Sequence, residues 1–475
     1  MIAVLILLAV FIGIVLVRTA RFTPKAQPEL STEPVEFDRE KAVSNLAELI
    51  RCKTISYSDH SLEDDAEFEK LISKLPGLYP HVFRTCEFSR LPDRALLFRW
   101  PGQSPEEPSV MMAHYDVVPV NEENWEKPAF EAIIEDGVMW GRGTLDTKGT
   151  FNGALFAADT LIAQGFVPAH DIYFAFSGGE EVNGKGAENI VELFREKGIV
   201  PGIVVDEGGA VVENVFPGVK GACGLIGIAE KGMMNARFRT RSAGGHASAP
   251  KPNMPVDILA RTCTKVVGHP FKMHLTKPVA EMFDTLGRHS SFLYRMIFAN
   301  LWCFGWVLDL LGKMSGGEIN ALLRTTVAFT QMEGSAAANV IPPEAKMVAN
   351  MRLNPADSVA SALEYLKKTV GDDRVEITAL EASEPSRISR TDCESWDRVA
   401  AAVGETWPGC IVAPYLMVQC SDSRSWGVIS DKVYRFSAMD LTSEERATIH
   451  GNNERVRLEG VHKAVEFYIR LMKKC

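Results

Sequence analysis

Acidic and imidazole side chains gather in four short blocks of this chain, at residues 112–116, 140–148, 177–181 and 205–209. Histidine, aspartate and glutamate without cysteine suit borderline-hard divalent ions, zinc first and then cobalt or manganese. A catalytic zinc usually takes about three protein ligands, and the blocks offer more than that. The surplus predicts two metal ions that share a bridging carboxylate, about 3.5 to 4 Å apart, with a water between them.

Three apolar runs, each typical of a buried strand, lead into these blocks. They cover residues 110–113, 172–176 and 203–205. In an α/β fold the carboxyl ends of parallel strands converge on one crevice. We therefore expect one histidine and several carboxylates to meet at a single mouth.

The order and spacing of the motifs resemble a known family. The motifs are H-x-D at 114–116, G-R-G-x-x-D-x-K at 141–148, G-G-E-E at 178–181 and D-E-G-G at 206–209. Together they resemble the M20 metallopeptidases, most closely the branch of carboxypeptidase S and the N-fatty-acyl-amino-acid hydrolases. The resemblance covers most of the chain from about Phe37. It implies an α/β zinc-peptidase catalytic domain, a mixed sheet flanked by helices, with an inserted α+β lid or dimerisation domain.

The resemblance also implies a set of metal ligands. It predicts two Zn²⁺ per subunit, with Co²⁺ or Mn²⁺ as substitutes, held by His114, Asp146, Glu181, Glu207 and His450. Asp146 would bridge the two ions and, as often in the family, precede a cis peptide bond; otherwise it is an ordinary cap of the helix expected at 150–164. The choice between Asp206 and Glu207 as ligand stays open.

Three further residues are candidates for catalysis. Asp116 lies two positions after His114, on the same side of a strand, where it can fix the tautomer of the ring. Adjacent carboxylates raise each other's pKa unless metals neutralise them, so one of Glu180 and Glu181 should bind metal while the other handles the proton. The resemblance makes Glu180 the general base and His246 a lid residue that steadies the oxyanion, in dimeric members that of the partner subunit.

Substrate contacts are expected from the lid. By resemblance, Asn339 and Arg352 hold the substrate's carboxylate, and the planar guanidinium of Arg352 suits that anion. The alternative for Arg352 is a surface charge on a strand. Residues 421–424 resemble a loop near the substrate.

The chain divides into five expected segments. They are an N-terminal membrane anchor or signal peptide at 1–22, a tether at 23–36, a first catalytic part at 37–228, a lid or dimerisation domain at 229–355, and a second catalytic part at 356–475.

The N-terminal segment is an unbroken apolar run from residue 2 to 17, followed by Arg18, Arg21 and Lys25. Its length of about 26 Å as a helix is at the short end for a membrane span. The basic residues follow the run and no small-residue cleavage site does, so the pattern favours an uncleaved single anchor over a signal peptide. The side of the membrane on which the body lies stays open.

A second apolar segment, residues 289–311, interrupts the lid with large aromatic and aliphatic groups. One interpretation is a helical hairpin packed in its own core. The other is a surface that lines an acyl-chain pocket or contacts the membrane.

Charge and composition exclude other classes of protein. The 475 residues carry a net charge of −10 with no basic block, which excludes nucleic acid as a partner. Nine cysteines without a paired spacing indicate reduced thiols rather than a disulfide framework.

The function expected from these features is hydrolysis of an amide bond next to a free amino-acid carboxylate, as a carboxypeptidase acting on short peptides. An alternative is an N-acyl amino acid hydrolase or synthase, and a homodimer through the lid is implied. A third hypothesis is a non-catalytic, membrane-tethered binding protein. The presence of Asp116, Glu180 and the whole ligand set argues against it.

Overall fold

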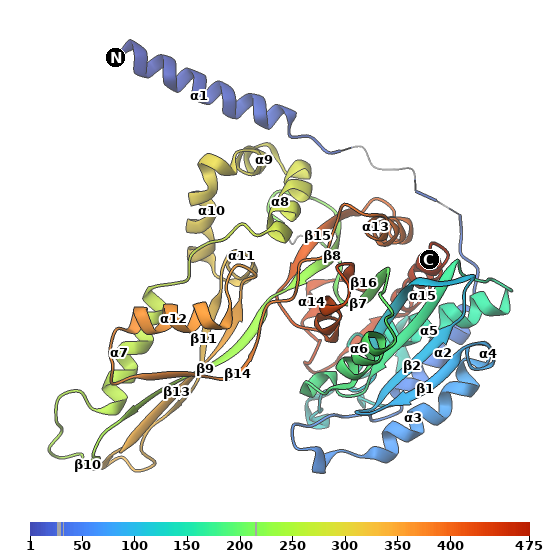
Figure 1. Ribbon diagram of the computed structural model, residues 1–475, viewed down its shortest axis with the longest axis horizontal. Helices are drawn as coiled ribbons and strands as arrows, with labels where there is room; N and C mark the ends of the chain where they lie inside the picture. Colours follow the sequence, from blue (N-terminus) through green and yellow to red (C-terminus); the bar gives the residue numbers. More distant parts are fainter. Residues whose placement is uncertain (26–29, 32, 214–215) are drawn as a thin grey trace.

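A computed structural model describes all residues except 26–29, 32 and 214–215 (Figure 1). Part of the expected tether therefore lies outside the described residues. The first helix, α1 (Ile2–Arg21), projects from the rest of the molecule. It is long and apolar enough to cross a membrane.

An eight-stranded mixed sheet forms the centre of the larger part of the fold. Its strands, in spatial order, are β1 (Glu87–Leu91), β2 (Ala95–Trp100), β6 (His170–Ser177), β3 (Ser104–His114), β7 (Ile203–Glu213), β16 (Val433–Leu441), β8 (Ala222–Glu230) and β15 (Ile411–Met417). β3 pairs in parallel with both β6 and β7. The expectation that these three strands open at one edge is therefore confirmed.

Helices cover both faces of this sheet, in agreement with the expected α/β class. One face carries α2 (Arg39–Ile50), α3 (Asp65–Leu78), α4 (Pro80–Thr85), α5 (Lys148–Ala163), α13 (Glu394–Thr406) and α15 (Leu458–Met472), and the other carries α6 (Gly186–Glu196). Successive side chains of a strand point to opposite faces of the sheet. On β3, Met111 packs against the face that carries α5, and Val110 and Met112 pack against the face that carries α6. Asp38 caps α2 by accepting a hydrogen bond from the Lys41 backbone.

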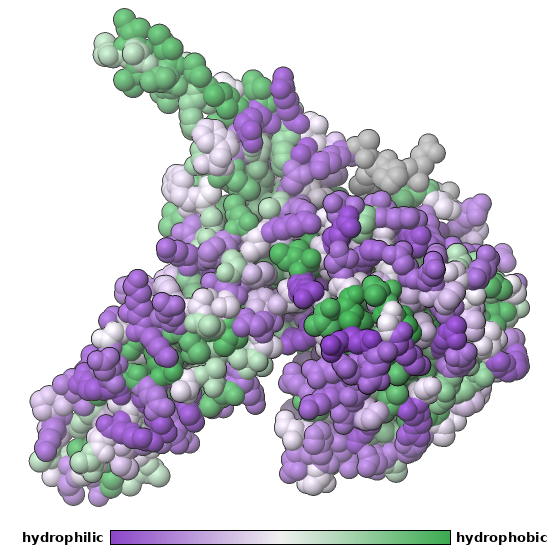
Figure 2. Space-filling view, viewed as in Figure 1, coloured by the Kyte–Doolittle hydropathy of each residue, from purple (hydrophilic) through white to green (hydrophobic). Residues whose placement is uncertain are grey.

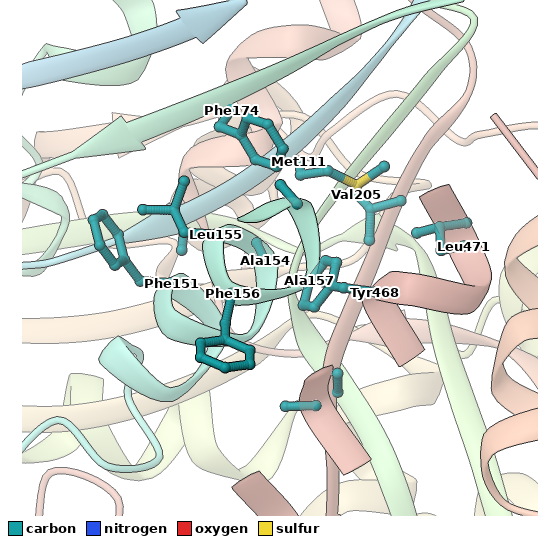
Figure 3. Close-up of a cluster of buried hydrophobic side chains, with 14 of the residues drawn as sticks. Met111, Phe151, Ala154, Leu155, Phe156, Ala157, Phe174, Val205, Tyr468 and Leu471 are labelled. Carbon is teal, nitrogen blue, oxygen red and sulfur yellow. The ribbon is translucent and has the colours of Figure 1, made fainter. Parts of the chain in front are cut away.

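The core between α5 and the sheet combines strand side chains with both alanines and large apolar residues of the helix. Met111, Phe174 and Val205, from β3, β6 and β7, face this helix (Figure 3). α15 packs closely on α5 at Gly153. A Cβ atom added at this glycine would lie only 3.1 Å from the Cβ of Ala464. This packing fixes the helix that begins just after Asp146.

A separate antiparallel sheet forms the expected α+β unit. Its strands, in order, are β11 (Thr326–Glu333), β13 (Glu344–Leu353), β9 (Gly232–Arg241) and β14 (Glu376–Ser383), with α7 (Pro255–Gly268) and α12 (Val359–Val370) packed on one face. Buried and half-buried residues alternate along β9 and β13. The expected boundary at residue 355 falls before α12, while the sheet continues to β14. We therefore propose that the lid extends to Ser383.

Short elements complete these two parts. They are β10 (Gly245–His246) paired with β12 (Val340–Ile341), the small sheet of β17 (Arg455–Arg457), β5 (Val138–Trp140) and β4 (Ile133–Glu135), the helix α14 (Ser443–Arg446), and the 3-10 turns η1 (His60–Leu62), η2 (Glu122–Asn124), η3 (Glu180–Val182) and η4 (Asp422–Val428). Figure 1 places β10 at the end of the lid farthest from the eight-stranded sheet.

Four helices lie between α7 and β11. They are α8 (Lys277–His289), α9 (Phe292–Ala299), α10 (Leu301–Ser315) and α11 (Gly317–Leu323). α9 and α10 are bent by 114° at Asn300 and form a helical hairpin, but its buried side chains Phe298 and Leu308 pack with residues of other elements rather than in a core of their own. This hairpin contacts α1, which Figure 2 shows as a largely hydrophobic rod that extends beyond the hydrophilic body.

Candidate active site

The structure brings the five expected metal ligands to one edge of the eight-stranded sheet. They come from different elements: His114 ends β3, Asp146 precedes α5, Glu181 lies in η3, Glu207 lies on β7, and His450 follows α14. This is the edge at which the carboxyl ends of the parallel strands meet. Their convergence follows from the strand order, since β6 and β7 flank β3.

Asp146 lies between the two histidines. His114 Nε2 is 2.9 Å from Asp146 Oδ1, and His450 Nε2 is 3.0 Å from Asp146 Oδ2. Each oxygen of one carboxylate therefore faces a different imidazole. The Asp146–Thr147 peptide bond is cis, as the resemblance implied.

Each histidine has a second carboxylate beside it. Glu207 Oε1 lies 3.5 Å from His114 Nε2, and Glu181 Oε2 lies 3.0 Å from His450 Nε2. Two half-sites result, joined through Asp146. They differ in access to solvent, because the His114 side chain is 1% exposed and that of His450 is 53% exposed.

The charges in this cluster call for cations. Burial raises the pKa of Glu181 and, to well above the usual range, that of Glu207. Hydrogen bonds to Asp146 and Glu181 raise the pKa of His450 to about 10. A raised pKa means that the ionised form of a buried carboxylate is destabilised. Divalent cations bound beside these carboxylates would stabilise the ionised form.

The geometry also fits a metal centre. Ligand atoms of His114, Asp146 and Glu181 all lie within 4.8 Å of one another, and so do those of His114, Glu180 and Glu207. Glu181 Oε1 is buried and has no hydrogen-bond partner among the residues that the structure describes. A buried carboxylate oxygen left unpaired is costly, and a metal ion would satisfy it. The donors are nitrogen and oxygen, as borderline-hard cations prefer.

Asp116 connects the first histidine to the acidic turn. His114 Nδ1 lies 3.0 Å from the backbone oxygen of Asp116 and 3.4 Å from its Oδ1. These acceptors favour a proton on Nδ1, which leaves the lone pair of Nε2 free to face the cluster. The two carboxylate oxygens of Asp116 accept hydrogen bonds of 3.2 Å from the backbone N–H groups of Glu180 and Glu181. Asp116 is fully buried, so it holds both groups in place.

Glu180 occupies an environment that favours its protonated form. Burial raises its pKa well above the usual range; the charge of His114 opposes this rise, and that of Asp422 adds to it. A carboxylate that binds protons readily is suited to general acid–base work. Asp422 accepts a hydrogen bond from Ser177 Oγ, and burial raises the pKa of Asp422 to about 7. The loop at 421–424, identified from the sequence without a role, thus lies beside the acidic turn.

The geometry distinguishes Asp206 from Glu207. The carboxylate of Asp206 accepts a hydrogen bond of 2.9 Å from the backbone N–H of Ser423. Glu207 instead points to His114. Of the two alternatives left open by the sequence, this arrangement supports Glu207 as the ligand.

Glu454 is a positioning residue whose role sequence reasoning missed. Its carboxylate is fully buried and accepts hydrogen bonds from the backbone N–H groups of Gly143, Leu145 and Asp146. Arg142 Nη1 donates to it at 2.6 Å. The available signal was an acidic residue four positions after His450, in a segment without apolar periodicity.

Two of the expected lid residues, His246 and Asn339, are not placed with the metal cluster. His246 is exposed on β10, with its Nδ1 2.7 Å from Ser248 Oγ, and Asn339 is exposed beside it, at the distal end of the lid (Figure 1). Arg352 lies at the opposite end of the lid, near the C-terminal end of β13, where its Nη1 is 3.4 Å from Cys420 Sγ. Within one chain, therefore, His246 and Asn339 are separated from Arg352.

Comparison with known proteins gives a consistent result. Residues 110–474 match the family model described as peptidase family M20/M25/M40. A probable carboxypeptidase S-like 2 of Dictyostelium discoideum is 32% identical and aligns with 97% of this chain and 92% of its own. The N-fatty-acyl-amino acid synthase/hydrolase PM20D1 of Xenopus tropicalis is 33% identical and aligns with 99% of this chain and 94% of its own. The solved M20 family metallo-carboxypeptidase Sso-CP2 of Sulfolobus solfataricus has the same fold, with a TM-score of 0.67, 17% identity, and 91% and 98% of the two chains covered.

Proposed function

The chain belongs to peptidase family M20/M25/M40, and from this premise we propose that it is a dinuclear zinc amidohydrolase that cleaves the amide bond next to a free amino-acid carboxylate. The observation that carries the proposal is the position of Asp146, whose two oxygens face His114 and His450. A single carboxylate between two imidazoles is the arrangement that two metal ions sharing a bridging ligand require.

The residues that would hold the ions follow from the two half-sites. His114, Asp146 and Glu207 would hold one, and Asp146, Glu181 and His450 the other. When bound, such ions lower the pKa of a water and polarise a carbonyl oxygen. Zinc is preferred for its match to nitrogen and oxygen donors, with Co²⁺ and Mn²⁺ as substitutes.

Glu180 would move the proton. Its carboxylate accepts a proton from the attacking water and later gives it to the amide nitrogen, so that the C–N bond breaks and a free amine leaves. Asp116 acts through its neighbours: it fixes the backbone of η3 and the tautomer of His114. Burial raises the pKa of Glu180, which favours the protonated form that it takes between the two steps.

Substrate binding would require the lid. Arg352 is suited to hold the free carboxylate of the substrate through paired N–H groups. His246 and Asn339 lie at the far end of the lid, in and beside the separate pair of strands β10 and β12, so we propose that they serve the active site of a second copy in a homodimer. In that arrangement His246 would donate to the developing oxyanion.

Two substrate classes fit this site, short peptides and N-acyl amino acids. The relatives at 32% and 33% identity are named for one class each. Both present an amide carbonyl followed by a free carboxylate, which is the unit that the catalytic residues and Arg352 can recognise. Synthesis of an N-acyl amino acid is the reverse of the same reaction.

We also propose that α1 is an uncleaved membrane anchor. It is a helix of 20 residues, apolar from residue 2 to 17, with Arg18 and Arg21 in its last turn. Only 11% of its most apolar window is buried against the rest of the protein, so a lipid environment would cover what the protein does not.

The test uses the full chain in detergent with zinc, and a panel of dipeptides and N-acyl amino acids with short and long acyl chains. We expect release of free amino acid, reduced about 10² to 10⁴ fold in Glu180→Gln. Bound zinc, measured in parallel, should remain. The matched control is Glu188→Gln, an exposed residue of α6.

The outcomes separate the hypotheses. Release from peptides alone assigns a carboxypeptidase, and release from long-chain acyl substrates assigns an N-acyl amino acid hydrolase. Equal activity in Glu180→Gln and the unaltered protein would exclude Glu180 as the base. Zinc binding without release from any substrate would favour the binding-protein hypothesis.

A further inference from the structure

One face of α10 is exposed and largely apolar, apart from the ion pair between Lys313 and Asp309. Trp302, Trp306, Leu310 and Met314 recur every fourth residue, and each is between 48% and 76% exposed. A helix that covers a globular core turns its apolar stripe inward. Here part of the apolar surface faces outward, and the exposed side chains Phe292 and Leu293 of α9 extend it. An apolar surface of this kind indicates a partner.

The hairpin is joined to α1 by specific contacts. The guanidinium of Arg18 donates two hydrogen bonds, of 3.2 and 3.1 Å, to the backbone oxygen of Ala299. Asn300 Nδ2 donates to Val15 O and Thr19 Oγ1, both at 3.2 Å. α1 is therefore held beside the bend between α9 and α10 rather than on a free tether.

An aromatic contact extends this junction toward the middle of α1. The rings of Phe11 and Trp302 lie edge to face, with centroids 5.7 Å apart. Phe11 is ten residues before Arg21, or about 15 Å along a helix. If α1 enters a bilayer up to Arg21, Trp302 lies beside a part of α1 that is below the bilayer surface.

The polar groups at the bend are satisfied internally. Asn300 is fully buried, and its Nδ2 also donates to the Met296 backbone oxygen at 2.9 Å. The Ala299 oxygen, which the break in the helix leaves free, is taken by Arg18. Hydrocarbon tolerates broken helices only where such groups find partners within the protein. The bend meets that requirement.

Charged residues lie at the end of α1, and the charged pair on α10, Lys313 with Asp309, lies toward the C-terminal end of that helix. Arg288 Nη1 donates to Thr23 O at 3.0 Å, with its guanidinium 4.4 Å from the centre of the Phe22 ring. Lys25 forms an ion pair of 3.0 Å with Asp284. Basic side chains at this level suit the polar headgroup layer, which places the boundary of the bilayer near Phe22.

We propose that the α9–α10 hairpin inserts its exposed face into the bilayer leaflet entered by the C-terminal half of α1, as an element that lies in one leaflet without crossing. The 114° bend is too sharp for the two helices to cross as one span. The proposal rests on the proposed anchoring of α1. We assign lipid as the partner of the exposed face of α10, because this face adjoins α1, a helix that itself requires a lipid environment. Two attachments would hold the catalytic body against the membrane surface.

The test exploits the sequence of α1, which contains no tryptophan. The full chain is reconstituted into phosphatidylcholine vesicles whose acyl chains carry bromine, a short-range quencher of tryptophan fluorescence. Insertion of α1 alone changes no tryptophan fluorescence, because α1 has no tryptophan. Quenching by bromine therefore reports on the hairpin. Vesicle flotation, measured on the same samples, reports on the anchor.

We expect the unaltered protein to float and to be quenched, and Trp302→Phe/Trp306→Phe to float with most of the quenching lost. The matched control is Trp140→Phe, a half-exposed tryptophan of β5 that should leave the quenching unchanged. A protein that floats without quenching, or is quenched equally in the double variant, would overturn the insertion of the hairpin.

Other outcomes separate this proposal from those on which it rests. Failure to float overturns both the anchor and the hairpin insertion, while hydrolysis, assayed separately, continues to test the proposed function. Tryptophan emission that shifts to the blue with protein concentration, without bromine quenching, would assign the stripe to contact with a second copy and overturn the lipid proposal.

Discussion

Arg142 and Glu454 are 312 positions apart in the chain, yet their side chains meet at 2.6 Å and are both almost fully buried. Glu454 also accepts the backbone N–H of Leu145 at 2.7 Å. The last part of the chain thus shapes the turn that presents Asp146. A salt bridge of this kind is evidence for positioning more than for stability, because desolvation offsets much of its attraction.

Replacing Glu454 by Gln should impair both folding and turnover. The charge of Arg142 would remain buried without a counter-charge, which costs about 3 to 5 kcal/mol. Thermal unfolding should therefore occur at lower temperature, and kcat should fall because Asp146 loses its fixed position. Glu459→Gln, at an exposed position of α15, is the control. Unchanged unfolding temperature and kcat in the Glu454 variant would show that the turn before Asp146 keeps its conformation without Glu454.

The elements around the site were predictable because each is signalled locally. His114 and Glu181 follow apolar runs, and parallel strands open at one edge, so their convergence follows from the sequence. The pairing of Glu454 with Arg142 was not predictable, since no local pattern connects residues so far apart. The exposure of Trp306 is a similar case: periodicity shows that side chains share a face of α10, but only the tertiary packing decides whether that face is covered.

The lid shows the same limit. Strand alternation identified β9 and β13, whose residues are half-buried in turn. β14 joins the edge of the same sheet from beyond an intervening helix, and its pairing with β9 depends on contacts between residues more than 130 positions apart, such as Arg239 and Glu376. The sequence alone therefore placed the end of the lid earlier in the chain.

Removing His450 should lower the metal content without unfolding the protein. The His450 side chain is 53% exposed and belongs to one half-site only, beside Asp146 and Glu181. We expect His450→Ala to retain about one metal ion of two, because the other half-site keeps His114. Elemental analysis after gel filtration measures this. His269→Ala, at an exposed position of the lid, should keep the full content, and equal content in both variants would remove His450 from the ligand set.

Lys231 should make stability depend on pH. It is buried, and its ammonium donates to the backbone oxygens of Ala321 and Arg324. Burial, with the nearby charge of Arg352, lowers its pKa to about 7. The unfolded chain keeps an ordinary lysine pKa near 10.4, so it binds a proton that the folded chain lacks between these values. The free energy of unfolding should fall as pH drops from about 10 to about 7, and stay level below that.

The variant Lys231→Met tests that effect. It should flatten the pH dependence of the unfolding midpoint in this window, because no proton is then taken up at this position on unfolding. Lys251→Met, which alters an exposed lysine, should leave the dependence as it is. The same slope in both variants would mean that Lys231 stays charged in the folded protein.

His246 provides the sharpest test of the proposed homodimer, because it lies on β10, far from the cluster that contains Glu180 (Figure 1). If it serves the partner's site, His246→Ala and Glu180→Gln should each be inactive alone. Chains of the two variants unfolded together and refolded as a mixture should regain about one quarter of the activity, since half of the dimers would be mixed and each would hold one intact site. Activity that stays at zero after mixing, with dimers present, would place the function of His246 within its own chain. Full activity of His246→Ala alone would remove it from catalysis.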